Sequence, residues 1–97
     1  MNLITVSNGR FDDNGSDFKI VGANNYYIGF ATPAMRAAVF DAAKSIGLNV
    51  LRSPAFLDAP WRGAYFQSWN PATNCLQVNT GEDGLQRLDH LIAAAEQ

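Results

Sequence analysis

The sequence predicts an α/β fold in which antiparallel strands are followed by two strand–helix units. Near its start, two Asn-Gly dipeptides separate short apolar runs, a pattern typical of tight hairpins. A helical pattern then lies between two further apolar runs, which is the order of a βαβ unit with parallel strands. A second helical pattern ends the chain.

Composition limits both the size of the core and the kinds of partner. A chain of 97 residues forms one domain with a thin core, because it buries only about 60 to 65% of its unfolded surface. Hydrophobic residues at 47% and charged residues at 16% indicate a globular protein. A net charge of -2 without a basic stripe predicts no nucleic-acid partner, and no apolar run is long enough to predict a membrane span.

The sequence predicts neither a metal site nor a cofactor. His90 is the single histidine and has no neighbouring cluster of ligands, so we expect it at the surface. Cys75 is the single cysteine, so it cannot form an internal disulfide, and we expect it to have no role in function. The first six residues have neither the basic nor the apolar stretch of a signal peptide, so a leader, if the protein is secreted, is expected upstream or already removed.

The first elements are short strands joined by turns. Asn8-Gly9 and Asn14-Gly15 predict type I′ turns, because both residue types tolerate positive φ. The apolar run at residues 18–22 predicts the next strand, which leads into a polar and aromatic stretch.

The first helix begins after Thr32 and ends at Gly47. A threonine hydroxyl can cap free amides, and Pro33 is tolerated at the first helical position. One predicted apolar face contains Met35, Ala38, Val39, Ala42 and Ile46. After the glycine, residues 48–52 predict a strand that runs parallel to the one at 18–22.

Residues 53–80 predict a long ordered loop, since they contain three prolines and five aromatic residues without a clean period. Residues 80–83 then resemble a capping box at the start of a second helix. Its predicted apolar side contains Leu85, Leu88, Leu91, Ile92 and Ala95. No stop signal or further parallel strand follows, so we expect the chain to be truncated.

Several segments resemble, in order, the start of glycoside hydrolase family 5, the endo-mannanases and cellulases. They are FKIVGANNYY (18–27), AAKSIGLNVLR (42–52), YFQSWNP (65–71) and NTGEDGLQRLD (79–89). The resemblance implies a partial (β/α)8 TIM barrel within a single truncated domain. Residues 1–17 would form an N-terminal β-hairpin, and residues 18–97 the first two βα units.

The resemblance also implies a retaining hydrolase of β-1,4-linked polysaccharide, either β-mannan or β-glucan. In this family the acid/base glutamate follows the fourth barrel strand and the nucleophile follows the seventh, and neither strand is predicted here. Retaining hydrolysis needs two carboxyl groups about 5 to 5.5 Å apart, so we expect this chain to be inactive alone. Ser53-Pro54 replaces the Thr-Trp often found in mannanases, which leaves mannan and glucan both open.

Candidate site residues follow the two predicted parallel strands. The resemblance implies that Arg52 orients the nucleophile carboxylate, whereas the alternative is a solvated arginine at a strand end. Asn25, Tyr26 and Tyr27 are candidates to bind sugar hydroxyls, although turn formation and packing explain such residues equally well. Further candidates are two tryptophans that can stack on sugar rings or cover the loop, Trp61 and Trp69.

Two other classes of function remain open. The chain could be a small carbohydrate-binding module without catalytic chemistry, or a partial barrel that self-associates to cover an open sheet edge. For the parent family the resemblance implies an extracellular location.

Overall fold

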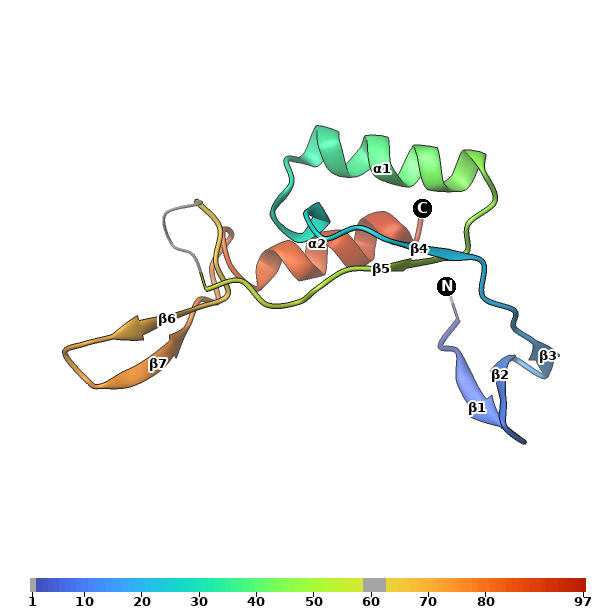
Figure 1. Cartoon of the computed structure of the whole chain (residues 1–97), viewed down its shortest axis with the longest axis horizontal. Helices are drawn as coiled ribbons and strands as arrows, with labels where there is room; N and C mark the ends of the chain where they lie inside the picture. Colours follow the sequence, from blue (N-terminus) through green and yellow to red (C-terminus); the bar gives the residue numbers. More distant parts are fainter. Residues whose placement is uncertain (1, 59–62) are drawn as a thin grey trace.

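The structure, a computed structural model, describes residues 2–58 and 63–97 as three small sheets with two α-helices and a short 3-10 helix (Figure 1). The strands are β1 (Thr5–Ser7), β2 (Arg10–Asp13), β3 (Ser16–Asp17), β4 (Gly22–Asn24), β5 (Val50–Arg52), β6 (Gln67–Asn70) and β7 (Cys75–Val78). The helices are η1 (Ile28–Phe30), α1 (Pro33–Ser45) and α2 (Gln86–Ala95).

Strands β1, β2 and β3 form an antiparallel sheet in sequence order, a three-stranded meander where the sequence predicted a hairpin. Both predicted turns are confirmed, since Asn8 and Gly9 have φ of 51° and 75°, and Asn14 and Gly15 have 50° and 90°. The third strand exists because the second turn reverses the chain again.

Strands β4 and β5 pair in parallel, as predicted. The predicted first strand at residues 18–22 is wrong in its bounds, because β4 starts only at Gly22. The amide of Phe18 still donates to the carbonyl of Phe11 in β2, at 2.8 Å. Residues 18–22 therefore change partner from the meander to the parallel pair, and they do not form one continuous strand.

Asn49 stabilises residues 19–21, where the chain changes its strand partner. Its side-chain amide donates to the carbonyl of Lys19 at 2.8 Å, and its Oδ1 accepts from the amide of Val21 at 2.8 Å. The Asn49 backbone amide also donates to the carbonyl of Val21, at 2.9 Å. These bonds align the chain that enters β4 with the start of β5.

Helix α1 begins and ends as predicted. The Thr32 hydroxyl accepts from the amide of Met35 at 3.2 Å, Pro33 takes the first position, and Gly47 has a φ of 76° beyond the last turn.

The predicted apolar face of α1 is wrong. Met35 is 49% exposed and Ile46 is 72% exposed, whereas Arg36 is buried. The reason is tertiary, because α1 packs against η1 and α2, which cover the side of the helix that carries Arg36 and the half-buried Phe40. Periodicity identifies an apolar stripe but not which side neighbouring elements cover.

The segment predicted as a long loop contains a β-hairpin, so that prediction is wrong for residues 67–78. Strands β6 and β7 pair antiparallel, and a turn that includes Asn74 at φ 53° connects them. Asn70, Pro71 and Asn74 are residue types that favour turns, and they were the sequence signal for this hairpin. The strands themselves are short and show no clean alternation of apolar and polar residues.

Helix α2 starts at Gln86, six residues after the predicted capping threonine. Residues 81–84 form a turn instead, because the Oδ1 and carbonyl of Asn79 accept from the amides of Gly81 and Leu85, at 3.0 and 2.9 Å. Glu82 and Asp83 therefore precede the helix, and no side chain caps it. The predicted apolar side is only partly covered, since Leu88 and Leu91 are half-buried while Ile92 is 57% exposed.

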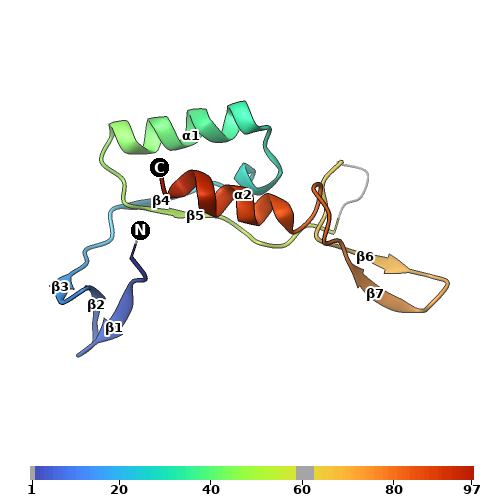
Figure 2. The ribbon, with the colours of Figure 1, turned by 180° about the vertical axis from the view of Figure 1, so that it is seen from behind.

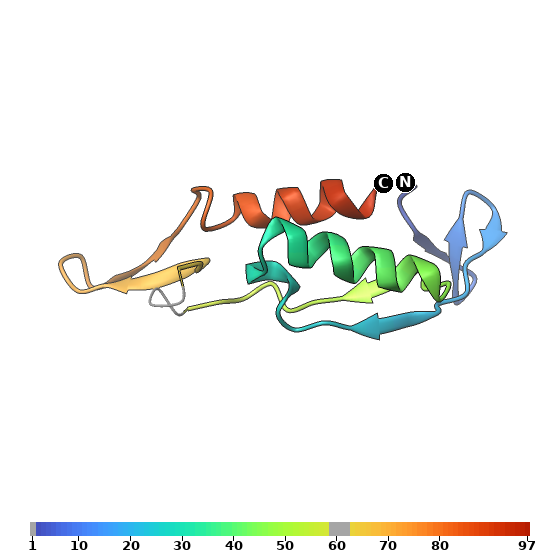
Figure 3. The same cartoon turned by 90° about the horizontal axis from the view of Figure 1, so that it is seen from above.

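The molecule is open. Helix α1 lies over the β4–β5 pair and α2 runs beside it (Figure 3). The buried hydrophobic side chains of the described residues are Ile28, Ala31, Ala64 and Phe66. The radius of gyration is 16.2 Å, against about 13 Å for a compact chain of this length. No helix of residues 2–58 and 63–97 is long and apolar enough to cross a membrane.

Candidate functional site

Strands β4 and β5 bring the predicted residues Asn25 and Arg52 together. Asn24 pairs with Arg52 in the parallel register, and the amide of Asn25 donates to the carbonyl of Arg52 at 2.9 Å. Both strands therefore end at the same level, and the residues that follow them share one edge. We call Asn25, Tyr26, Tyr27 and Arg52 the rim.

The side chain of Asn25 shapes the backbone that follows it. Its Oδ1 accepts from the amides of Tyr27 and Ile28, at 3.0 and 2.9 Å, and so stabilises the turn that leads into η1. Ile28 is fully buried and anchors this turn in the small core. The oxygen of the Asn25 amide is thus engaged, whereas its Nδ2 group has no hydrogen-bond partner among residues 2–58 and 63–97.

Tyr26 and Tyr27 form an edge-to-face pair. Their ring centroids are 5.6 Å apart and their planes meet at 89°. Tyr26 is 73% exposed, whereas Tyr27 is half-buried. Tyr27 can thus support a tyrosine ring that stands free in solvent.

Arg52 is exposed at the end of β5. Within the part of the chain that the structure describes, its guanidinium has no hydrogen-bond or ion-pair partner. Among the described residues, the ion pair lies in the meander and joins Arg10 to Asp17, at 3.1 Å. The Arg52 guanidinium is therefore available to an anion or a carboxylate.

The tryptophans are not part of the rim. Trp69 lies on β6, in the hairpin that projects from one end of the molecule, and is 56% exposed. Trp61 lies outside the described residues. Phe66, at 6% exposure, is part of the small core.

Three aspartates near turns, Asp12, Asp13 and Asp83, have structural partners. The Oδ1 of Asp12 accepts from the amide of Gly15 at 2.8 Å, that of Asp13 from Asn2 at 3.0 Å, and that of Asp83 from Asn79 at 3.1 Å. Among residues 2–58 and 63–97, no three His, Cys, Asp or Glu side chains lie close enough to hold a metal. His90 and Cys75 are exposed.

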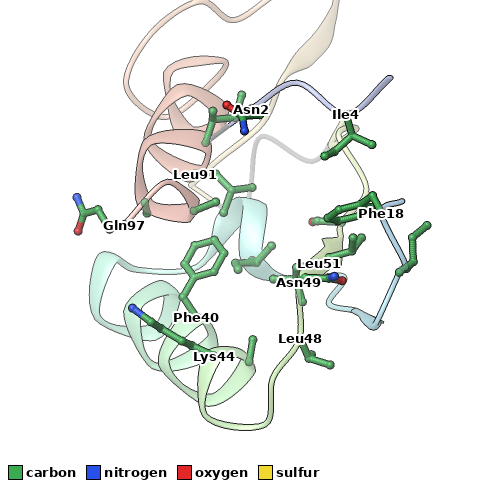
Figure 4. Close-up of a pocket in the computed structure, with 18 of the residues that line it drawn as sticks. Asn2, Ile4, Phe18, Phe40, Lys44, Leu48, Asn49, Leu51, Leu91 and Gln97 are labelled. Carbon is green, nitrogen blue, oxygen red and sulfur yellow. The ribbon is translucent and has the colours of Figure 1, made fainter. Parts of the chain in front are cut away.

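A groove of about 890 Å³ lies between the meander, α1, β5 and α2 (Figure 4). Phe18, Phe40 and Leu51 line it together with Leu91, and no rim residue does. Its lining is mainly aliphatic and aromatic, so the groove is the open side of the hydrophobic core and a separate feature from the rim.

Sequence reasoning missed Asn49 and Asn79, which position the rim and the hairpin. The side-chain amide of Asn79 donates to the carbonyl of Tyr65 at 3.1 Å at the base of β6, just as Asn49 bridges to the start of β4. An asparagine at a strand end was the signal, but its partners are about 14 to 30 residues away in the chain. Such bonds follow from the fold.

No family model matches the chain. It is 40% identical over 92 residues to the probable mannan endo-1,4-β-mannosidase F of Neosartorya fischeri, and 41% identical over 92 residues to mannan endo-1,4-β-mannosidase F of Aspergillus clavatus. These matches cover 90% of this chain and 20% and 21% of the two relatives, so the chain spans about a fifth of their length.

A solved structure agrees with these relatives. The endo-1,4-β-mannanase of Rhizomucor miehei superposes with a TM-score of 0.88 at 30% identity, over 98% of this chain and 27% of that protein. The resemblance to endo-mannanases predicted from the sequence is therefore confirmed. The arrangement of the elements is therefore similar to that of a part of this solved endo-mannanase.

Proposed function

We propose that this chain contributes one wall of the substrate cleft in a retaining glycoside hydrolase similar to mannan endo-1,4-β-mannosidases. In this proposal, residues 18–97 form the first two βα units of a (β/α)8 barrel, and the meander before them closes one end. The observation that carries the proposal is the bond from the Asn25 amide to the Arg52 carbonyl, at 2.9 Å. It brings polar groups to the carboxyl ends of two parallel strands, where barrel enzymes bind substrate.

Each rim residue has a distinct proposed role. The Arg52 guanidinium donates charged hydrogen bonds to a sugar hydroxyl in this chain alone, and to the nucleophile carboxylate that it would orient in a whole barrel. The Asn25 Nδ2 group donates to a sugar hydroxyl, while its oxygen keeps the turn in shape. Tyr26 offers a ring face to a pyranose, and Tyr27 holds that ring upright.

We propose that the chain alone binds polysaccharide without cleaving it. Its two glutamates are Glu82, in the turn before α2, and Glu96, which follows α2 at its C-cap, and both are exposed. In this proposal neither glutamate is catalytic, and the carboxyl pair for retaining hydrolysis is supplied by residues outside this chain. Such a polymer is too large to cross a membrane unaided, so we also propose that the protein binds it outside the cell.

The test combines hydrolysis with binding. The purified chain is incubated with β-mannan and with carboxymethyl cellulose, and reducing ends are measured; we expect none above background. Calorimetry with mannohexaose and cellohexaose then measures affinity, which we expect to fall about tenfold in Arg52→Ala, the loss of one charged hydrogen bond. Arg10→Ala, an exposed arginine in the meander, is the matched control. Turnover by this chain, or equal affinity in Arg52→Ala, contradicts the proposal.

A second candidate function is self-association, and the groove favours it. β4 and β5 form a two-stranded sheet whose outer edges have no strand partner among the described residues. Unpaired edges beside an apolar groove are surfaces on which another polypeptide can add. Sedimentation distinguishes this candidate, because a monomer at all concentrations removes it.

A further inference from the structure

The hairpin of β6 and β7, residues 67–78, is an arm that projects from one end of the molecule (Figures 1 and 2). Trp69 is 56% exposed, Leu76 61% and Val78 55%. A two-stranded hairpin without packing partners is marginally stable in water, and large exposed apolar side chains mark a surface that binds something.

The arm has one apolar and one polar face. Residues opposite each other in an antiparallel pair share a face, and Trp69 pairs with Leu76 while Gln67 pairs with Val78. The other face carries Ser68, Asn70, Cys75 and Gln77, and there the Asn70 amide donates to the Gln77 oxygen at 3.2 Å. The exposed tryptophan is therefore part of a continuous apolar strip, flanked by the amide of Gln67.

Charge distinguishes the possible partners of this strip. Residues 64–81 contain no Asp, Glu, Lys, Arg or His, although charged residues make up 16% of the chain. A nucleic acid or an anionic membrane surface requires Lys or Arg. Protein interfaces have polar edges and are enriched in Arg as well as in aromatic residues, and this segment contains no Arg. A neutral partner with apolar C–H faces and many hydroxyls matches a surface of aromatic, aliphatic and amide groups.

The arm also lies at the correct end of the molecule to continue the rim. Strands β4 and β5 both run toward the end from which the arm projects (Figure 1). A long polymer bound at Arg52 and Tyr26 can therefore extend in the direction of Trp69.

We propose that the apolar face of the arm is a second binding platform for neutral polysaccharide, with the Trp69 indole under one pyranose ring. The inference deepens the proposed function, on which it rests for the identity of the polymer, β-mannan. The platform selects long chains, because a short oligosaccharide fills the rim and does not reach the arm.

The experiment compares mannobiose, mannohexaose and soluble galactomannan as probes of the full chain by calorimetry. Trp69→Ala is expected to lower affinity for galactomannan about fivefold, the loss of one stacking contact, and to leave mannobiose unchanged. Trp69→Phe, which keeps a ring, is expected to retain affinity within about twofold, and Gln77→Ala on the polar face is the matched control. Amide spectra of each variant verify that the arm is folded, and the Trp69 indole N–H signal is expected to shift on titration.

The outcomes separate this inference from the proposed function. Equal galactomannan affinity in Trp69→Ala, or an indole signal that does not move, overturns the platform, whatever Arg52→Ala does. A loss in Trp69→Ala with none in Arg52→Ala supports the platform and overturns the rim. Self-association that disappears in Trp69→Ala assigns the strip to a polypeptide and overturns the platform.

Discussion

Asn25 illustrates how one side chain can be needed for shape before it is needed for chemistry. Both hydrogen bonds that it accepts go to the same oxygen, from the amides of Tyr27 and Ile28. Asn25→Asp keeps that oxygen, so we expect its free energy of unfolding to stay within about 0.5 kcal/mol of the parent, whereas Asn25→Ala loses about 1 to 2 kcal/mol. Urea titrations measure both. Asn24→Ala, one residue earlier, is the control, and an aspartate variant as unstable as the alanine variant contradicts this role of the Asn25 oxygen.

Asn49, unlike Asn25, forms side-chain hydrogen bonds with residues that are distant in the sequence. Its side chain bonds both Lys19 and Val21, at 2.8 Å each. Asn49→Ala loses both bonds, and we expect it to lower the free energy of unfolding by about 1 to 2 kcal/mol. Asn49→Asp keeps the acceptor and loses the donor, so its expected loss is intermediate. Hydrogen exchange at the Val21 amide provides the direct readout, and unchanged protection in Asn49→Ala excludes the bridge.

At the scale of elements, the parallel pair depends on a close approach at Gly22. A Cβ there would lie 2.8 Å from the carbonyl oxygen of Val50 and 3.2 Å from its Cβ. Gly22→Ala therefore pushes β4 away from β5, and we expect a loss of about 1 to 3 kcal/mol in the free energy of unfolding. Gly29→Ala is the matched control, because its Cβ would meet nothing nearer than 3.8 Å. Equal losses in the two variants exclude the close approach as the cause.

The elements that the sequence predicts well are those with local signals. Asn8-Gly9, Thr32 and Gly47 determine turns and helix ends through backbone angles and nearby amides, and all three are confirmed. The predicted apolar face of α1 and the start of α2 are wrong because distant partners decide them. The hydrogen bonds of Asn79 hold residues 81–84 in a turn, so α2 begins later than predicted. Helices η1 and α2 cover the side of α1 that carries Arg36.

The same division applies to the candidate site. The neighbourhood of Asn25 and Arg52 follows from a parallel crossover, which the order of patterns predicts. The separation of Trp69 from the rim does not follow from the order of patterns. It depends on the hairpin at residues 67–78, which no clean alternation of apolar and polar residues predicts. The role of the Asn25 oxygen in the turn before η1 also depends on the fold, since a sequence shows an amide without its partners.

The whole molecule exposes more surface than a compact protein of its size. Its accessible surface is 7143 Å², against about 5,500 Å² for a folded monomer of 10.6 kDa. The excess includes apolar groups around the groove, among them the 57% exposed Ile92. We therefore expect the chain to associate with itself as its concentration rises, since association removes this surface from water.

Sedimentation equilibrium over a concentration series measures this association. Ile92→Glu introduces a charge into the groove, so we expect its dissociation constant for self-association to rise about tenfold, equivalent to the burial of one isoleucine side chain. Leu3→Glu changes a side chain that is 89% exposed and does not line the groove, and we expect the parent value. If the two glutamate variants weaken association equally, net charge explains the effect and the groove is not the interface. If only Ile92→Glu acts, the open side of the core is the surface that a second polypeptide covers.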